Sequence, residues 1–353
     1  MNSICRQVFV LVLISLFSLN AVAATKTSAD NLVFDDYPLA EALNLPDWFS
    51  LSFLDLQDSL DEALKDGKKG LIIYFGRKDC AYCKSLLENN WGDPAIIKYT
   101  QQNFNVIAID VRGDRVVTDF AGKTWTEKSY SANRRTNFTP TLLFFNAKGQ
   151  QALKLPGYRP KYQFRASLEY VSDAHYKRES FRNYLARAET AMGFGSEELN
   201  ENDAFISPPY NLDRSQAATQ NKKASPLVVF FEHPRCHACD VLHGDILNTD
   251  EVAALLYKLD VVQLNSHEDT PVITPSGNRT TASQWANELN LTFAPSMIFF
   301  DNNGKEILRV ESVIRFNRLN NVLRYIIGEE YRKFPTFQDW LHFMRSSNKG
   351  VKK

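Results

Sequence analysis

Four cysteines, arranged as two Cys-x-x-Cys pairs, are the residues of this sequence best suited to chemistry. They are Cys80 and Cys83 in the first half of the chain, and Cys236 and Cys239 in the second. Two cysteines three positions apart at a helix start lie on one face, close enough to form a disulfide. A cysteine at a helix N-terminus is favoured as the thiolate, which is the nucleophile of disulfide exchange. The spacing therefore predicts two redox-active dithiols.

The order within each pair predicts the two roles in exchange. Cys80 and Cys236 are expected to attack, and Cys83 and Cys239, one turn further along, to resolve the mixed disulfide. Neighbouring positive charges favour the thiolate and negative charges oppose it. The cationic or titratable neighbours are Arg77, Lys78, Lys84, Arg235, His233, His237 and His243, and the acidic ones are Asp79, Glu232 and Asp240. The simpler interpretation of any one of them is a solvated rim around the site.

Three other interpretations of the cysteines stay open at this point. A purely structural disulfide across two intervening residues would remove little chain entropy and would stabilise the fold poorly. A metal site is the second alternative, because Cys236 and Cys239 are followed by His243, with His233 or His237 nearby. A partner-binding module without exchange chemistry is the third, although intact dithiols in both halves argue against it.

Composition indicates a globular chain of more than one domain. With 353 residues, 44% hydrophobic and 23% charged, the chain is too apolar to be disordered and too charged for a protein of many membrane spans. Single cores usually stop growing well before this length, so two domains are expected. The 41 basic residues balance the 41 acidic ones, which gives no electrostatic reason to expect nucleic acid as a partner.

An internal repeat places one cysteine pair in each half. A shift of 155 or 156 residues brings the first pair onto the second, and Phe-Thr-Pro-Thr at 138–141 onto Phe-Ala-Pro-Ser at 293–296. The shift is too long for a solenoid and is an ordinary domain length. We therefore expect tandem domains at residues 45–190 and 226–346. The mostly polar segment 191–225, which contains two adjacent prolines, is expected to link them.

The same order of elements is predicted in both halves, and these elements must position the cysteines. A short apolar run, 71–75 or 227–231, predicts a buried strand directly before each pair, which then opens a helix. Further strands are expected at 105–111 and 259–264. The apolar runs 141–145 and 297–300 are expected to be strands that end in hairpin turns. Amphipathic helices at 162–171 and 316–327 are expected to close each half. Capping boxes are expected for Thr124 with Glu127 and for Thr281 with Gln284. Alternating strands and helices followed by a late hairpin indicate an α/β fold with helices on the faces of the sheet.

The first 23 residues are expected to be a cleaved secretory signal peptide. Arg6 is the only charge in the first 25 residues, an apolar run of 12 residues extends from Val8 to Leu19, and Ala-Val-Ala at 21–23 is a small-residue cleavage pattern. The apolar run is shorter than the roughly 20 residues that span a bilayer. Cleavage would remove Cys5 and leave every cysteine in a pair, which fits a bacterial periplasm best.

The combination of strand, Cys-x-x-Cys helix start and later proline resembles the thioredoxin superfamily in both halves. The likeness is nearest to periplasmic SoxW-like thioredoxin-related proteins, and it is carried by Val228–Glu232, Phe299–Gly304 and Tyr325–Trp340. It implies two tandem thioredoxin-like domains, each with a mixed central sheet and helices on both faces. It also implies that Pro140 and Pro295 are cis-prolines that offer a ladder-type contact to an extended substrate.

The sequence departs from thioredoxin itself at two points. Thioredoxin has Gly-Pro between its cysteines, where this chain has Ala-Tyr and His-Ala. Six residues before the first cysteine, thioredoxin has a buried acid, where this chain has Tyr74 and Phe230. These departures leave open how protons are handled during exchange.

We predict a periplasmic thiol–disulfide oxidoreductase that uses no cofactor and reduces disulfides of exported proteins through both dithiols. The resemblance implies a membrane electron donor of the DsbD or CcdA type. Within the same class the alternative is an isomerase or an oxidant, because related dithiols span roughly −270 to −120 mV. Outside it, the alternative is a metal- or partner-binding module that uses the cysteines as ligands.

Overall fold

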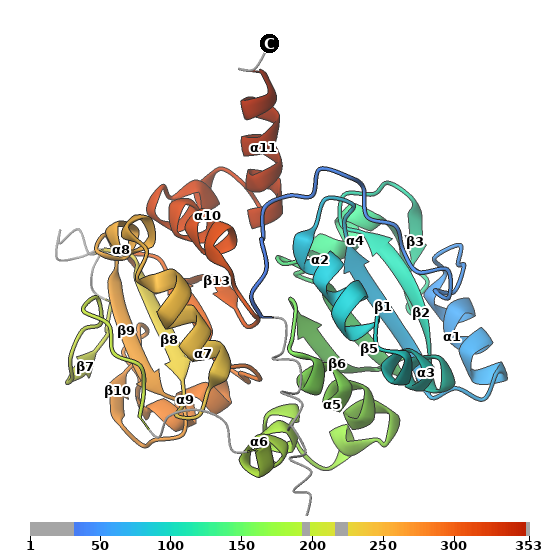
Figure 1. Ribbon diagram of the computed structural model, residues 1–353, viewed down its shortest axis with the longest axis horizontal. Coiled ribbons are helices and arrows are strands. Elements are labelled where there is room, and N and C mark those ends of the chain that lie inside the picture. Colours follow the sequence, from blue (N-terminus) through green and yellow to red (C-terminus); the bar gives the residue numbers. More distant parts are fainter. Residues whose placement is uncertain (1–31, 193–197, 216–224, 351–353) are drawn as a thin grey trace, which may run out of the picture.

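The computed structural model describes residues 32–192, 198–215 and 225–350. They form two α/β units that lie side by side, and the N-terminal segment, drawn in dark blue, runs between them and then along the first unit to its first helix (Figure 1). Each unit is built on a four-stranded mixed sheet with helices on its faces. The predicted tandem α/β architecture is therefore confirmed. The predicted signal peptide, 1–23, lies outside the described residues.

The sheet of the first unit has the strand order β2-β1-β5-β6. Strand β1 (Gly70–Gly76) runs parallel to β2 (Phe104–Asp110) and antiparallel to β5 (Thr141–Asn146), which forms a hairpin with β6 (Gln151–Pro156). Every residue of β1 is buried. This burial explains its continuous apolar run, since separate apolar clusters cover the two faces of the sheet.

The sheet of the second unit repeats this arrangement in the order β13-β12-β8-β9. Its buried strand β8 (Leu227–Glu232) runs parallel to β9 (Asp260–Asn265) and antiparallel to β12 (Ser296–Phe300), which pairs with β13 (Glu306–Val310). In both units the buried central strand ends just before the cysteine pair, so the sheet fixes where the pair begins.

Helices and short strands complete the two units (Figure 1). The first unit contains α1 (Leu56–Lys65), α2 (Ala81–Ser85), the π-helical turn η1 (Leu86–Asn90), α3 (Pro94–Asn103), β3 (Val116–Thr118), β4 (Thr124–Thr126), α4 (Glu127–Asn133), α5 (Lys161–Ser172), η2 (His175–Lys177) and α6 (Phe181–Met192). The second contains β7 (Tyr210–Asn211), α7 (His237–Leu242), the π-helical turn η3 (His243–Leu247), α8 (Asp250–Leu256), β10 (Pro271–Ile273), β11 (Arg279–Thr281), α9 (Ala282–Glu288), α10 (Phe316–Ile327), η4 (Glu330–Arg332) and α11 (Phe337–Gly350).

The two capping predictions have different outcomes. Thr281 caps α9 with its side chain, which supplies one half of the predicted box. The box predicted for Thr124 and Glu127 is wrong, because the β3–β4 pairing continues to Thr126 and the helix starts only after it. Thr126 therefore caps α4, and it forms a capping box with Ser129.

Most of the described part of the predicted linker 191–225, namely residues 198–215, packs on the second unit. Strand β7 lies there and pairs in parallel with β10. Leu212 is buried in the apolar cluster on one face of the second sheet, and Arg214 forms an ion pair with Asp260 on β9. This stretch therefore belongs to the fold of the second unit.

The two units meet directly at the ends of strands β6 and β13. The amide of Val313 donates a hydrogen bond to the carbonyl of Tyr158 over 3.1 Å. Next to it, Gly157 has a φ of +72°, and a Cβ atom there would fall 2.1 Å from Oγ of Ser312. The conformation and the close approach both require glycine at this point.

Helix α11 adds a second connection between the units. Nε2 of Gln338 donates to the carbonyl of Asn137 in the first unit over 2.7 Å, and the Phe337 ring lies 5.5 Å from that of Phe138.

Among the described residues, no helix has both the length and the apolar character needed to cross a bilayer.

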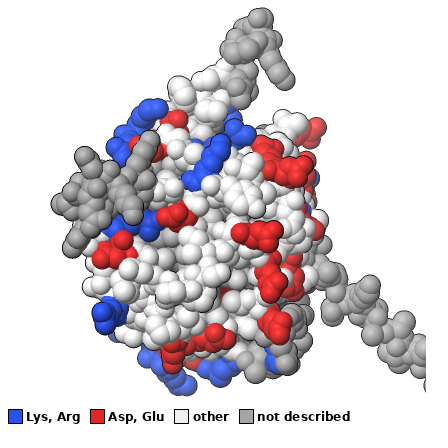
Figure 2. All heavy atoms as spheres, turned by 90° about the vertical axis from the view of Figure 1, so that its left-hand side faces the viewer, with Lys and Arg blue, Asp and Glu red and all other residues white. Residues whose placement is uncertain are grey.

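Charges on the outer face of the second unit are mixed. Figure 2 shows acidic side chains most numerous toward the right-hand side of this face and basic ones toward its upper left and lower edge, with wide uncharged areas between them.

Candidate active sites

Cys80 and Cys83 form a disulfide in the first unit, with Cα atoms 5.1 Å apart. Cys80 caps α2, and the amide of Cys83 donates to its Sγ over 3.0 Å. Both cysteines are almost fully buried, with Cys80 1% exposed. The apolar strand β1 and this cap place the sulfurs at the start of a helix, where an N–H group can stabilise a thiolate.

The loop that holds Pro140 lies against this disulfide. The Thr139–Pro140 peptide bond is cis. Oγ1 of Thr139 donates to Sγ of Cys80 over 3.2 Å, and its carbonyl oxygen lies 3.5 Å from the same sulfur. The structure thus brings together Cys80, Cys83 and Pro140.

Tyr82, the third residue of the first motif, is built into the interface between the two units. Its hydroxyl donates to Asp36 over 2.8 Å and accepts from the amide of Arg315 over 2.8 Å. The guanidinium carbon of Arg318 lies 3.2 Å from the centroid of the Tyr82 ring, and Arg318 donates through Nη2 to the carbonyl of Thr139 over 2.9 Å. The first turn of α10 therefore covers the first motif and uses the carbonyl beside its cis-proline.

Asp36 holds that turn of α10 in place. Its two carboxylate oxygens accept hydrogen bonds from the amides of Asn317 and Arg318, over 2.9 and 2.7 Å, which is helix capping by a residue far away in the chain. Burial raises the pKa of the Tyr82 hydroxyl well above its ordinary value. Burial also lowers the pKa of Arg318, opposed by Tyr82 and Asp36.

Asp79, directly before Cys80, gathers three arginines. Its carboxylate lies 2.8 Å from Arg77, 2.7 Å from Arg345 and 3.5 Å from Arg112. Burial opposes ionisation of Asp79, but the three arginines hold its pKa below the ordinary value. Burial lowers the pKa of Arg77 to about 9. These charges therefore pair with one another and attach α11 to the first unit.

Cys236 and Cys239 form the corresponding disulfide in the second unit, with Cα atoms 5.2 Å apart. Cys236 caps α7 and its Sγ accepts from the amide of Cys239 over 3.1 Å. The Ala294–Pro295 peptide bond is cis. Within this motif His237 is exposed to solvent, in contrast to the buried first motif.

A pocket opens beside Cys236. The second unit lines it with the motif residue His237 and with Phe293 and Ala294, which precede the cis-proline. The first unit contributes Pro160, Tyr162 and Gln163 from the start of α5. The second disulfide, with Cys236 7% exposed, therefore borders a small recess of about 30 Å³ between its proline loop and the first unit.

Glu232 and His243 form a buried polar pair behind the second motif. Glu232, the last residue of β8, is fully buried, and both its oxygens lie within 3.1 Å of Nε2 of His243. Gln263 on β9 donates to Glu232 over 2.8 Å, and Nδ1 of His243 is buried without a partner in the described structure. The interpretation of both as solvated rim is wrong, because β8 is covered on both faces.

At the positions of this pair the first unit has Gly76 and Leu87, by the 156-residue shift. Glu232 follows Phe230 by two residues, and residues two apart on a strand point to the same face. The second unit therefore has an acid on the same strand face as the position of thioredoxin's buried acid, and the first does not.

A family model described as a thioredoxin-like domain matches residues 56–172 and again residues 212–327, more than half of the chain. The chain belongs to the thioredoxin-like family. Both matches contain a cysteine pair and a cis-proline. Among curated proteins, no significant match is found.

Solved structures that resemble part of this thioredoxin-like chain have low sequence identity to it. A thioredoxin-fold protein from Helicobacter pylori is 22% identical, with a TM-score of 0.32, and the match covers 41% of this chain and 89% of that one. The C-terminal domain of DsbD from Neisseria meningitidis is 12% identical, with a TM-score of 0.25, over 33% and 98% of the two chains. A DsbH oxidoreductase is 14% identical, with a TM-score of 0.25, over 39% and 97%.

Two histidines stack beside the second thioredoxin-like site. The rings of His233 and His267 lie 4.6 Å apart and nearly parallel, and His233 lines the pocket of Cys236. Burial lowers the pKa of His267 to about 4, with further contributions from His233 and Arg182. His267 therefore stays neutral at neutral pH. Our sequence reasoning missed it, because it reaches this place only through the parallel pairing of β8 and β9.

The metal-binding interpretation gains no support from the side chains. Within the described ranges, no group of three or more His, Cys, Asp or Glu is arranged to hold a metal ion. His243, the third ligand of that interpretation, points its Nε2 at Glu232, and both cysteines before it form a disulfide. Two thioredoxin-like domains with Cys-x-x-Cys disulfides support thiol–disulfide oxidoreductase activity.

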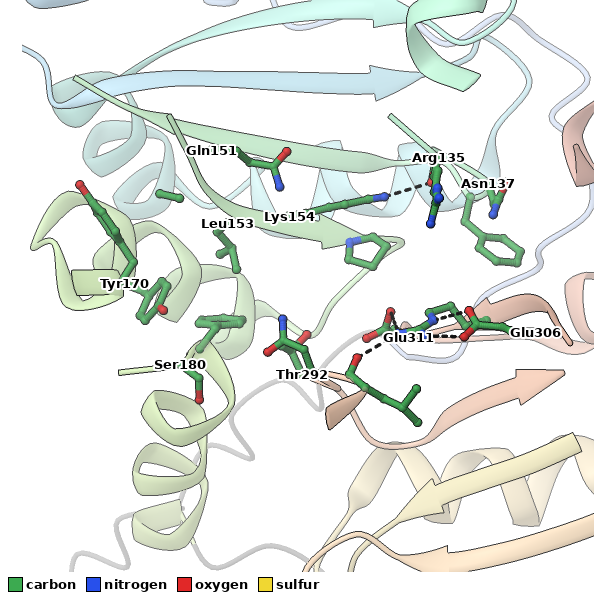
Figure 3. A pocket seen from close by; sticks show the side chains of 18 of the residues that line it. Arg135, Asn137, Gln151, Leu153, Lys154, Tyr170, Ser180, Thr292, Glu306 and Glu311 are labelled. Atoms are coloured by element: carbon green, nitrogen blue, oxygen red, sulfur yellow. Dashed lines mark hydrogen bonds and ion pairs between the residues drawn. The ribbon is translucent and has the colours of Figure 1, made fainter. Parts of the chain in front are cut away.

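A separate cleft of about 990 Å³ lies between strands β6 and β13 (Figure 3). Lys154 donates to two backbone carbonyls after α4, one of them that of Arg135 over 3.0 Å, and burial lowers its pKa to about 8. Across the cleft, Arg309 makes two hydrogen bonds to Glu306, over 2.7 and 2.6 Å. The cleft reaches Thr292 near the second proline loop, but its lining contains no cysteine. It is therefore distinct from the recess at Cys236.

Proposed function

We propose that this chain is a periplasmic thiol–disulfide oxidoreductase that reduces disulfides of exported proteins, and that the second dithiol is the one that meets them. The observation that carries this proposal is that the opposite unit covers the first motif more completely than the second. His237 is exposed and a pocket opens beside Cys236, whereas Arg318 and Tyr82 close the first motif.

The geometry supports a two-step exchange at the second site. The Cys236 thiolate attacks one sulfur of a substrate disulfide, and the other substrate sulfur leaves and takes a proton. Cys239 then attacks Sγ of Cys236, which releases the reduced substrate and forms the disulfide seen here. The amide of Cys239, 3.1 Å from Sγ of Cys236, stabilises the attacking thiolate through a charge-assisted hydrogen bond.

The N-terminal pattern at 1–23 supports export to the periplasm. There, the resemblance favours a membrane donor of the DsbD or CcdA type as the source of electrons. N-terminal sequencing of the protein from a periplasmic fraction should begin at Ala24. A protein that keeps residues 1–23, or that stays in the cytoplasm, would contradict this part of the proposal.

The deciding experiment compares Cys236→Ser with the matched Cys80→Ser variant. With dithiothreitol as electron source, we expect Cys236→Ser to reduce insulin at least about 100-fold more slowly, because the attacking sulfur is lost. Cys80→Ser should stay within about twofold of the unchanged chain, since the first motif is covered. The opposite order of effects would assign substrate reduction to the first dithiol.

The direction of electron flow is tested by the equilibrium potential of the second pair, measured with the first pair replaced by serine. A value near about −270 mV supports a reductant, and one near about −120 mV would reverse the assignment to an oxidant.

A further inference from the structure

Each of the two cis-proline loops places a phenylalanine side chain in the apolar core of the opposite domain. Phe138, two residues before the first cis-proline, belongs to the apolar core cluster of the second domain. Phe293, two residues before the second cis-proline, belongs to the cluster of the first domain. Both are almost fully buried. Each proline loop is therefore anchored in the opposite domain, and the two motifs face one interface.

Helix α7, which carries the second motif, packs against the surroundings of the first motif. Ala238 and Val241 contact the apolar cluster that contains Cys80, Tyr82 and Cys83. The start of α5, which belongs to the first domain, in turn lines the pocket of the second disulfide. The two redox centres therefore share one continuous contact region.

A protein substrate has no comparable access to the first disulfide. Cys80 is 1% exposed, and the carbonyl of Thr139, the ladder acceptor next to the cis-proline, is bonded to Arg318. Binding of an extended peptide there would require removal of α10, together with the contacts that Asp36 makes to its first turn. Ala238 of the second motif, by contrast, already packs against the apolar cluster that contains Cys80 and Cys83.

We propose that the dithiol of the first domain exchanges electrons with the dithiol of the second domain inside the chain, and does not act directly on protein disulfides. The proposal rests on the proposed function of the second dithiol. Tethered partners meet at an effective concentration in the millimolar range, which favours exchange within the chain over reaction with a dilute substrate.

The exchange needs no external oxidant or reductant. The Cys236 thiolate attacks Sγ of Cys80, the Cys80–Cys83 bond breaks, and Cys83 leaves as a thiolate that takes a proton. The Cys239 thiolate then attacks Cys236 and releases Cys80. One disulfide is consumed in the first domain and one is formed in the second, and the same steps run in reverse.

The direct test traps the intermediate in the full chain that carries Cys83→Ser and Cys239→Ser. Under mild oxidation with glutathione disulfide, Cys80 and Cys236 should form an intramolecular disulfide, identified by peptide mapping. Its rate of formation should stay constant over a tenfold range of protein concentration. Separate glutathione adducts on the two cysteines, or cross-linked dimers that increase with concentration, would overturn the proposal.

A second test leaves the first motif intact. We expect Cys236→Ser to slow reduction of the Cys80–Cys83 disulfide by a bacterial thioredoxin with its reductase at least tenfold, relative to the unchanged chain. Dithiothreitol should reduce it at similar rates in both, which controls for folding. Equal rates with the protein reductant would overturn the relay. Loss of insulin reduction in Cys236→Ser tests the proposed function separately, because that assay does not involve the first dithiol.

Discussion

The first dithiol lies under the opposite domain, whereas the second keeps part of its motif in contact with solvent. Both have the same cap, the same disulfide spacing and the same cis-proline. They differ in what surrounds the sulfurs: Tyr82 and Arg318 at the first, His237 and a buried Glu232–His243 pair at the second. The repeat thus preserves the local geometry of the two disulfides, and the neighbouring residues differ in how they cover them.

The Glu232–His243 pair should give the largest effect on stability. His243→Leu introduces the residue that the first domain has at this position, and it leaves a buried carboxyl group without its main partner. We expect the free energy of unfolding to fall by about 3 kcal/mol. Urea denaturation with intrinsic fluorescence measures it.

The matched control for this change is the double variant Glu232→Gln with His243→Leu. The double variant should cost less stability than His243→Leu alone, because a neutral amide then replaces the buried carboxyl group. If the single and double variants are equally stable, the pair does not contribute in the way that we describe.

Removal of the Arg318 side chain, which lies over Tyr82, should make the first dithiol as accessible to reagents as the second. In a reduced chain with Cys236→Ser and Cys239→Ser, we expect Arg318→Ala to raise the rate at which a polymer-linked maleimide modifies Cys80 at least about tenfold, because the contact over Tyr82 is lost. Mass-shift gels measure the rate. Arg324→Ala on the exposed side of the same helix is the control and should leave the rate unchanged; no acceleration with Arg318→Ala would refute the cover.

Tyr82→Phe tests the same interface more gently. Loss of the hydroxyl removes the hydrogen bonds to Asp36 and to the amide of Arg315, so we expect a loss of about 1 kcal/mol in the free energy of unfolding. Tyr257→Phe, at an exposed tyrosine, should cost nothing measurable. Equal stabilities of the two variants would show that this hydroxyl does not hold the interface.

The last prediction concerns pH and the second site. Since the pKa of His267 is lowered to about 4, the unfolded chain binds a proton between about pH 6.5 and 4 that the folded chain does not. Stability should therefore fall as the pH decreases through this window. Urea midpoints measured at several pH values should show a weaker decrease for His267→Gln; a decrease as steep as that of the unchanged chain would exclude this residue as a cause.

Local sequence predicted the elements that hold the sulfurs, because their causes are local. The apolar runs before Cys80 and Cys236 became buried central strands, and both pairs open helices. The error at Thr124 arose where a strand pairing, which is not local, delays the start of α4. The catalytic roles of the cysteines and the domain limits stay predictions.

The parts of the site that could not be predicted depend on contacts between distant residues. Asp36 and Arg318 lie 282 positions apart, and no periodicity connects them. Glu232 and His243 were recognised as neighbours of a cysteine, but their burial depends on how β8 and η3 pack. The position of Glu232 at the end of a wholly apolar run was the sequence signal that this acid is buried.

The reciprocal placement of Phe138 and Phe293 has a consequence for the stability of each half on its own. If each half were produced alone, its phenylalanine would be exposed to solvent, and the space that the other phenylalanine fills would be empty. Such a cavity costs several kcal/mol per site. Each half of the repeat therefore needs the other to complete its apolar core.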